Sequence, residues 1–455
     1  MRVARLILLS QLALAPLAAS AYGDRFERAL DEIGAGSGGA VIVERSPYRG
    51  GGDVRYDYLP VNVFAGRHAY LHSDRVGLKL DLGISRRVDL FLAFRHEGTP
   101  LSRPPAVLEG MAVREQGTDL GFGYRQRTAW GTLALEALHN VDGASEGSEL
   151  RLRLEDEVRR GRLRLWPQAT LAWRDAKLND YYYGVRATEA TGSRPAYRAG
   201  DGLNLQLALY ASYPLSAHWH LLAGVSATQW ASTVRNSPIA EGGLQTAATL
   251  GLLYEHSPQA GAFDAGQPLW VKLYYGKASE CDVAKIVRLV CTSTSTPEQT
   301  RVAAVELGRT LIERLNGWHM DIAGYIGLLH HDEKGFQPDH WQVNAYFKSF
   351  WYGFPWRDRV KTRIGIGSGL SYAGRVPWME VRDQERRGEN INKLITYLDP
   401  TIDVSLGDLI GSRRLKDTFV GLGVSHRSGI FGFSRLLGNV DGGSNYIYTY
   451  VEFAI

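Results

Sequence analysis

A histidine and a serine stand two residues apart near the end of this chain, in the stretch GVSHRSGIFG at residues 423–432. A serine hydroxyl becomes an effective nucleophile when a neighbouring imidazole accepts its proton. His426 and Ser428 therefore have the residue types of the general base and the nucleophile of an ester hydrolase. The alternative interpretation is a polar pair at the end of a strand, and the elements that position the two side chains decide between these interpretations.

The N-terminus and the composition indicate an exported β-protein. An apolar run follows Arg2 and Arg5 and ends in small residues, so residues 1–21 are predicted to be a secretory signal peptide. The 455 residues include 51 glycines, 23 tyrosines and 11 tryptophans, a composition that suits an outer-membrane barrel of a Gram-negative cell. The formal net charge of +4 comes without a basic cluster in the sequence, which argues against a nucleic-acid partner.

Apolar residues alternate with small or charged residues in many segments of the chain. These segments include 76–84, 88–95, 149–157, 161–173, 203–213, 244–255 and 360–373. Glycine, lysine or aspartate often fills the second face, which is the pattern of a membrane barrel with its apolar face outward. The predicted fold is therefore all-β, a transmembrane antiparallel β-barrel in the outer membrane. Beyond the signal peptide, no apolar stretch of the sequence is long enough for a transmembrane helix.

The alternation stops at PQAGAFDAGQ, residues 258–267, and resumes directly afterwards. A segment rich in proline, glycine and alanine predicts a linker. We therefore expect two barrels in tandem, over residues 22–257 and 268–455, with one wide barrel as the alternative. The last ten residues, YIYTYVEFAI, place apolar residues on one face and tyrosines on the other, as a closing strand requires.

Four motifs distinguish the first half of the chain. They are WRDAKLNDYYYGV (173–185), RPAYRAGDGLNL (194–205), LLAGVSATQW (221–230) and SPIAEGG (237–243). In these motifs the chain resembles the MipA/OmpV family of outer-membrane proteins, over residues 45–255. The resemblance implies a scaffold that binds a murein hydrolase and a murein synthase at the periplasmic face, and porin-like members of the family imply a channel as an alternative. The NDYYYGV block predicts a strand start anchored at the membrane interface by tyrosines, with a sugar- or partner-binding platform as the alternative.

The second half combines the His-x-Ser with a short loop and a closing strand. In these features it resembles the PagL-type lipid A 3-O-deacylases, which are eight-stranded outer-membrane barrels with a catalytic triad on the lipid-facing wall. The resemblance implies that Ser428 is the nucleophile, that His426 is the general base, and that lipopolysaccharide is the substrate. Strand parity continues the face of Val424 through both residues, so both are predicted to point outward.

The second half departs from that family at two positions. The glutamate that orients the histidine is missing, and Asp441 is the only acid in the matching region, GNVDGGSNY. Gly429 stands where the family has an asparagine. Asp441 is therefore the predicted third member of the triad. The sequence as a whole predicts a scaffold protein of the outer membrane, with a lipid A deacylase and a pore as the alternatives.

Two further segments hold residues that could do chemistry. Cys281 and Cys291 are predicted to form a local disulfide, because an exported protein meets an oxidising compartment. Histidines and acids gather in LLHHDEKGFQPDHW (328–341), a combination that can bind a divalent metal. Because this segment joins two alternating runs, we predict a solvated loop and expect no metal or other cofactor. The charge run RDQERRGENINK (382–393) is predicted to be a loop whose basic residues can pair with lipopolysaccharide phosphates.

Overall fold

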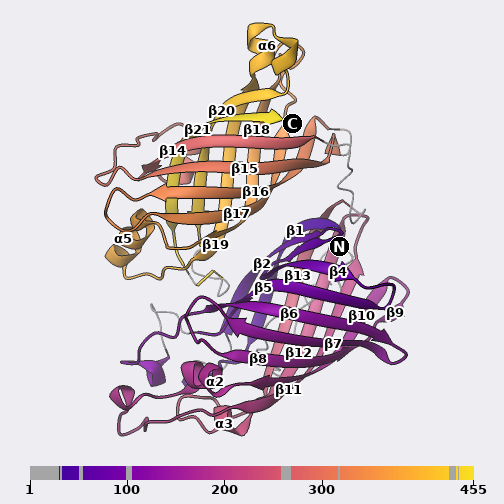
Figure 1. The fold of residues 1–455 in the computed structure, drawn as a ribbon, viewed down its shortest axis with the longest axis vertical. Coiled ribbons are helices and arrows are strands. Elements are labelled where there is room, and N and C mark those ends of the chain that lie inside the picture. The colour runs from indigo at the N-terminus through magenta and orange to yellow at the C-terminus, as the bar shows by residue number, and fades with distance from the viewer. Residues whose placement is uncertain are drawn as a thin grey trace, which may run out of the picture.

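The computed structural model describes residues 30, 33–50, 55–98, 105–257, 268–315, 318–429, 437–438 and 440–455. The predicted signal peptide and the predicted linker at 258–267 lie outside the described residues. The chain is all-β, and its strands form two antiparallel barrels in tandem, which confirms the predicted fold class (Figure 1). No helix in the described part of the chain is long and apolar enough to cross a membrane.

The first barrel has twelve strand positions. Its strands are β1 (Ala35–Glu44), β2 (Arg55–Ala65), β3 (Ala69–His72), β4 (Arg75–Asp81), β5 (Arg86–Arg95), β6 (Gly117–Thr128), β7 (Gly131–Asn140), β8 (Ser148–Glu155), β9 (Val158–Arg160), β10 (Leu163–Arg174), β11 (Gly202–Pro214), β12 (Trp219–Gln229) and β13 (Gln245–Ser257). Both β8 and β9 pair with β10, so these two strands fill one position. The barrel closes through the pairs β1–β13 and β10–β11.

The second barrel has eight strands and closes through the pair β14–β21. Its strands are β14 (Leu269–Ser279), β15 (Arg301–Ile312), β16 (Met320–Asp332), β17 (His340–Trp351), β18 (Thr362–Ala373), β19 (Leu394–Ser405), β20 (Thr418–Ser428) and β21 (Gly443–Ala454). The predicted closing strand at the C-terminus is β21. Eight is also the number of strands that the resemblance to the PagL-type barrels implies.

The alternation places apolar side chains outside and charged side chains inside. On β4 the side chains of Leu78 and Leu80 are 60% and 52% exposed, whereas Lys272 of β14 is 1% exposed. This is the inverted pattern of a membrane barrel. Not every aromatic residue at a strand end belongs to an outer girdle, however. Trp166 and Trp230 are buried, because Trp166 points into the lumen and Trp230 packs under the loops.

Ion pairs fill the lumen of the first barrel. Glu136 of β7 is 1% exposed and lies within 4.0 Å of four arginines, which come from three other strands. These arginines are Arg75, Arg125, Arg151 and Arg153. A carboxylate surrounded in this way is stabilised by charge although it is removed from water. The network therefore ties β4, β6, β7 and β8 together through one side chain.

The lumen of the second barrel is filled in the same way. Lys272 Nζ lies 3.0 Å from both Glu306 and Asp399. Arg363 donates two hydrogen bonds of 2.8 Å to Asp403, and it also pairs with Glu452. Tyrosine rings from β16, β17 and β21 stack between these groups. The narrower barrel is therefore a packed core along its described strands.

Each barrel has one end at which the connections are on average longer, and in the first barrel the opposite end has only short turns among the described residues. In the first barrel, the helices α2 (Ala176–Tyr183) and α3 (Ser232–Arg235) lie at the long-loop end. In the second barrel, α4 (Val283–Val287) and α5 (Trp378–Arg387) lie at the long-loop end, whereas α6 (Leu406–Ile410) lies at the end with the C-terminus (Figure 1). Short 3-10 turns at Ala106–Leu108, Ala187–Glu189 and Arg413–Leu415 complete the connections.

The NDYYYGV block is a helix, so the prediction of a strand start was wrong. Asp175 caps the helix α2, because its carboxylate accepts hydrogen bonds from the backbone N–H groups of Leu178 at 2.8 Å and Ser148 at 2.9 Å. On a helix, neighbouring tyrosines project in different directions. Tyr182 and Tyr183 consequently become buried under the loops, and only Tyr181 remains partly accessible.

Candidate functional site

Strand β20 positions His426 and Ser428 on the outer face of the second barrel. Arg427, which lies between them, points inward and donates hydrogen bonds to Glu380 and Ser371 in the lumen. The predicted strand parity is therefore correct. His426 is nevertheless only 8% exposed, whereas Leu422 on the same face is 55% exposed. Something other than lipid covers the outer wall at this point.

The cover is the connection between β14 and β15. Cys281 and Cys291 form a disulfide in this connection, with Cα atoms 5.7 Å apart. The disulfide and Ile286 of α4 pack against Val424 of β20 on the outer wall. The covalent link keeps this short helix folded over the strand that carries His426.

A chain of two hydrogen bonds orients the imidazole of His426. Its Nδ1 lies 2.6 Å from Oδ1 of Asn445, which stands directly opposite on β21. Nδ2 of Asn445 donates to the carbonyl oxygen of Cys281 at 3.1 Å. A carbonyl can only accept, so the amide orientation of Asn445 is fixed with Oδ1 toward the histidine. His426 then carries its proton on Nδ1, and Nε2 is left with the lone pair that a general base needs.

The structure brings the other two predicted triad residues to the same place but not into contact with the imidazole. Ser428 is half-buried, and its Oγ donates to the carbonyl oxygen of Gly429 at 2.9 Å. Asp441 lines the same cavity, and its backbone carbonyl accepts from Gln384. The position beside His426 Nδ1 is taken by Asn445.

These side chains line a cavity of about 950 Å³ on the outer wall. The helix α5 forms its second side and contributes Arg382, Arg386 and Arg387. The charge run predicted as a loop is thus partly helical. Acidic Glu380 in the first turn, basic residues in the last turn and Gly388 in the left-handed conformation (φ 66°) all favour this helix. The result is a cavity with a histidine and a serine on one side and guanidinium groups on the other, where Arg382 pairs with Glu280 and Arg387 pairs with Asp383.

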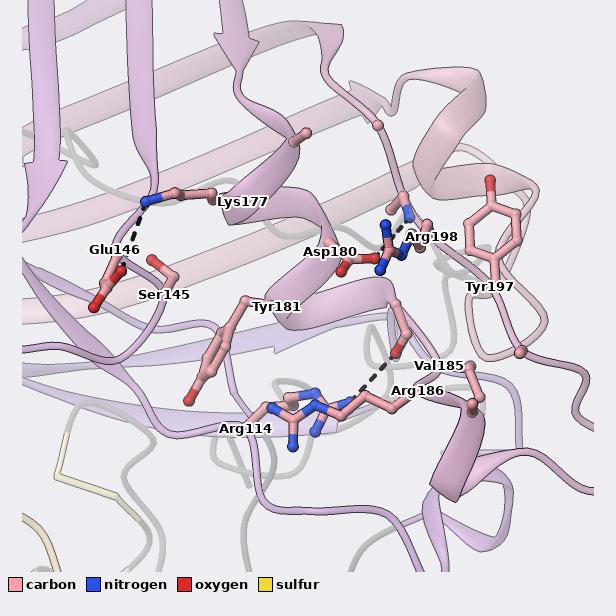
Figure 2. Close-up of a pocket in the computed structure, with 16 residues that line it drawn as sticks. Arg114, Ser145, Glu146, Lys177, Asp180, Tyr181, Val185, Arg186, Tyr197 and Arg198 are labelled. Atoms are coloured by element: carbon pink, nitrogen blue, oxygen red, sulfur yellow. Dashed lines mark hydrogen bonds and ion pairs between the residues drawn. The ribbon is translucent and has the colours of Figure 1, made fainter.

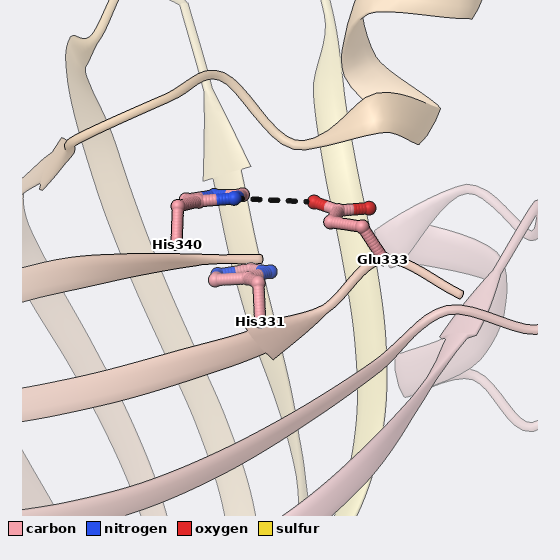
Figure 3. A group of neighbouring side chains, drawn as sticks. All are labelled: His331, Glu333 and His340. Carbon is pink, nitrogen blue, oxygen red and sulfur yellow. Dashed lines mark ion pairs between the residues drawn. The ribbon is translucent and has the colours of Figure 1, made fainter. Parts of the chain in front are cut away.

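A second cluster lies inside the same barrel, at its long-loop end. His331 and His340 face each other across β16 and β17, and Glu333 follows in the connecting loop (Figure 3). One ligand atom from each residue lies within 4.8 Å of the other two, and all three side chains are buried. The prediction of a solvated loop was therefore wrong for these residues. Burial raises the pKa of Glu333 to about 7.

The motif residues of the first barrel line a separate cavity of about 850 Å³, between α2 and residues 184–200 (Figure 2). Its polar groups hold the loops together. Asp180 accepts from the backbone N–H of Ala199, and Arg114 binds the carboxylate of Glu189 in a bidentate pair. Burial disfavours the charge on Glu189, but hydrogen bonds from Arg114 and from backbone amides outweigh it and lower its pKa to about 2. We assign this region a structural role.

Sequence reasoning missed Asn445 and the pairing of the two histidines. Nothing in the sequence around Asn445 indicates its role. It lies opposite His426 because of the register between β20 and β21, and the length of the connection between these strands does not determine that register. Parity and the position of the closing strand would have restricted the candidates to the outward residues of β21. For His331 and His340, the signal was the short spacing between two alternating runs, which brings the strand ends face to face.

Comparison with known proteins identifies the first barrel. Residues 37–256 match the family model described as MltA-interacting protein MipA. Outer membrane protein Omp26La of Vibrio anguillarum is 30% identical over 134 residues, which cover 30% of this chain and 52% of that protein. Outer membrane protein OmpV of Vibrio cholerae is 27% identical over 134 residues, which cover 30% of this chain and 52% of that protein. YiaT of Escherichia coli O157:H7 is 25% identical over 46% of this chain and 84% of that protein.

The family-model match coincides with the first barrel, and the two Vibrio matches span about half the length of those relatives. The strands β1 to β13 begin and end within a few residues of the region that the family model covers. The relatives are named as outer-membrane proteins, and the inverted alternation of both barrels agrees with that location. Residues 37–256 therefore form a domain of the MipA/OmpV family, and the chain is a β-barrel protein of the outer membrane.

Proposed function

We propose that the second barrel is a serine ester hydrolase that removes an ester-linked acyl chain from lipid A. The observation that carries this proposal is the hydrogen-bond chain from Cys281 through Asn445 to His426, because it sets the tautomer of a general base two residues before a serine. An asparagine can orient a catalytic histidine in place of an acid. In this proposal Asn445, rather than Asp441, is the orienting residue.

The reaction follows from these roles. Ser428 Oγ attacks the acyl carbonyl carbon while His426 Nε2 accepts the hydroxyl proton. The ester C–O bond breaks, His426 returns the proton to the departing sugar oxygen, and the acyl group remains on Ser428. Water then gives a proton to His426 and its hydroxide attacks the acyl carbon, so that a free fatty acid leaves and Ser428 regains its proton.

The surroundings of His426 and Ser428 agree with a lipid A substrate. Outer-membrane barrels have longer loops on the extracellular side, so the long-loop end with α4 and α5 is assigned to the outer leaflet, where lipopolysaccharide lies. An outward-facing cavity is open to acyl chains from the side. Arg386 and Arg387 on its far side are exposed and can bind the phosphates of lipid A.

The direct test uses the full chain, purified in detergent micelles and incubated with lipopolysaccharide or with phosphatidylethanolamine. Mass spectrometry of the released fatty acids should show a 3-hydroxy fatty acid from lipopolysaccharide and no release from the phospholipid. Equal release from both lipids would contradict selectivity for lipid A, and release from the phospholipid alone would make phospholipid the substrate. No release from either lipid would remove the hydrolase proposal.

Replacing Asn445 tests the orienting role. We expect Asn445→Ala to reduce kcat by about 10–10²-fold, because the imidazole loses the acceptor for its Nδ1 proton. Asn445→Asp keeps an acceptor in the same place and should retain more activity, with a shifted pH profile. A purely structural role would lower the amount of folded protein and leave the pH profile of the remaining activity unchanged.

We also propose that the first barrel binds a murein enzyme at its short-turn end, which the loop lengths assign to the periplasm. The matching family model is named for an interaction of this kind. The specific observation is an arginine rim on these turns and strand ends, formed by the exposed residues Arg67, Arg86, Arg127, Arg159, Arg160 and Arg162. Trp130, which is 81% exposed, stands on the same rim. Such a rim suits an acidic protein surface.

In-cell photo-crosslinking distinguishes the two ends of this barrel. A photoreactive residue in place of Trp130 should crosslink to a murein hydrolase, because that position lies on the arginine rim. The same residue in place of Lys177, at the long-loop end, is the matched control and should give no such product. Crosslinks of equal yield from both positions, or from Lys177 alone, would contradict periplasmic docking.

A further inference from the structure

We propose that His331, Glu333 and His340 form a binding site for a divalent transition metal, of which Zn²⁺ is the best-suited member. The site lies at the long-loop end of the second barrel, inside the lumen, and is separate from the outer-wall pair His426 and Ser428 (Figure 3). Two imidazoles and a carboxylate are a ligand set that zinc uses when it keeps a fourth position open.

The three residues are close in sequence, and one hairpin brings them together. His331 and His340 are paired residues of one antiparallel hairpin, so their side chains project from the same face. Their rings stack with centroids 4.6 Å apart. Glu333 lies in the loop of that hairpin, and its Oε1 is 3.5 Å from Nδ1 of His340. Short sequence spacing therefore yields three potential ligands at one end of the barrel.

Neighbouring side chains prepare His331 for a metal. Gln342 donates from Nε2 to Asn344 at 2.8 Å, which leaves its Oε1 toward His331 Nε2 at 2.9 Å. His331 therefore carries its proton on Nε2 and its lone pair on Nδ1. Nδ1 is buried and has no hydrogen-bond partner among the described residues. A metal-binding histidine usually donates its other N–H group to a fixed acceptor in this way.

In Glu333, as in His331, one polar atom of the side chain makes hydrogen bonds and the other makes none among the described residues. Its Oε1 accepts from Gln337 Nε2 at 3.1 Å and from the backbone N–H of Trp378 at 3.3 Å. Its Oε2 is buried and has no hydrogen-bond partner in the described part of the chain. Buried polar atoms are normally satisfied, so two unsatisfied acceptors on adjacent side chains indicate a missing cation.

Binding requires a small closure of the cluster. With metal–ligand distances of about 2.0–2.1 Å, tetrahedral ligands lie about 3.3 Å apart, so the three groups must move closer than the present 4.8 Å. The loop that carries Glu333 also contacts the start of α5 through Trp378. An ion bound here would fasten that loop and α5 to the two strands.

The test is zinc binding by the full chain, purified in detergent without a histidine tag and stripped with a chelator. We expect one Zn²⁺ per chain, and Co²⁺ in its place should give the visible absorption of a tetrahedral site. His331→Ala and the isosteric Glu333→Gln should each weaken binding by about 10²-fold or more. The Glu333→Gln variant guards against misfolding, and heat-modified mobility on gels checks that each variant is a folded barrel.

His330→Ala is the matched control. His330 is the adjacent histidine, but it lies on the outer face of β16 against Trp341. The proposal predicts unchanged zinc affinity for this variant. The proposal fails if the wild type binds no stoichiometric zinc, or if His331→Ala and Glu333→Gln keep wild-type affinity. A loss in His330→Ala as large as in His331→Ala would also overturn it. Because the readout is binding, this result is independent of the hydrolase proposal.

Discussion

Ser428→Ala is expected to lower ester hydrolysis by the full chain by about 10³-fold or more, with little change in the yield of folded barrel. The substitution removes Ser428 Oγ, which is the proposed nucleophile, so no acyl-enzyme can form at this position. Ser428 is half-buried and its hydroxyl makes one local hydrogen bond, to Gly429, so its loss creates no large cavity. Release of fatty acid from lipopolysaccharide by the purified protein measures the effect.

Ser368→Ala is the matched control for this prediction. Ser368 lines the same cavity from β18 and is exposed on the same outer wall. It lies away from the imidazole chain, so its removal should leave the rate within about twofold of the wild type. If the two serine variants lose activity equally, the cavity rather than Ser428 carries the effect. If both remain active, another nucleophile must be responsible.

Glu136→Gln is expected to destabilise the first barrel by about 3–5 kcal/mol. The substitution keeps the shape of the side chain but leaves four arginines without their shared carboxylate in a site that is 1% exposed. Removing one partner from a buried charge network costs far more than the net gain from forming the network, although Arg125, Arg151 and Arg153 each keep a second carboxylate. Urea unfolding of the full chain in detergent micelles, followed by circular dichroism, should show a lower midpoint for one of two transitions.

Glu146→Gln is the matched control, because it removes a negative charge from the surface of the first barrel and not from its lumen. Glu146 pairs with Lys177, and the two side chains are 70% and 66% exposed. Exposed pairs of this kind contribute about 0–1 kcal/mol, so the midpoint should hardly move. Equal midpoints for Glu136→Gln and the wild type would show that water or a counter-ion replaces the carboxylate in the lumen.

Much of the fold was predictable, because the alternation of apolar and polar residues along a barrel strand shows which face points outward. The alternation around Leu78 and Leu80 identified both the strand and its outer face, and the same parity placed His426 and Ser428 outward. The helix α2 was missed because Asp175 acts as an N-cap, a local hydrogen bond that outweighs the strand preference of three tyrosines. Trp166 is buried although it lies near a strand end, because an aromatic residue there can face either side of the barrel wall.

The candidate site was only half predictable. His426 and Ser428 lie on one strand, so strand parity alone determines that their side chains point to the same face. Asn445 depends on the register between β20 and β21, which a connection of about a dozen residues leaves unspecified. The burial of His426 depends on α4, which packs against the barrel wall from a different loop. Contacts of this kind arise from tertiary structure and leave no periodic signal in the sequence.

The most direct test of the proposed lipid A hydrolase activity is mass spectrometry of lipid A from a host that lacks this gene. The host is compared with the same strain carrying the wild-type protein and with one carrying Ser428→Ala. We expect the loss of one 3-linked acyl chain with the wild type, and unmodified lipid A in the other two strains. Identical lipid A in all three strains, with the protein present in the outer membrane, would contradict it.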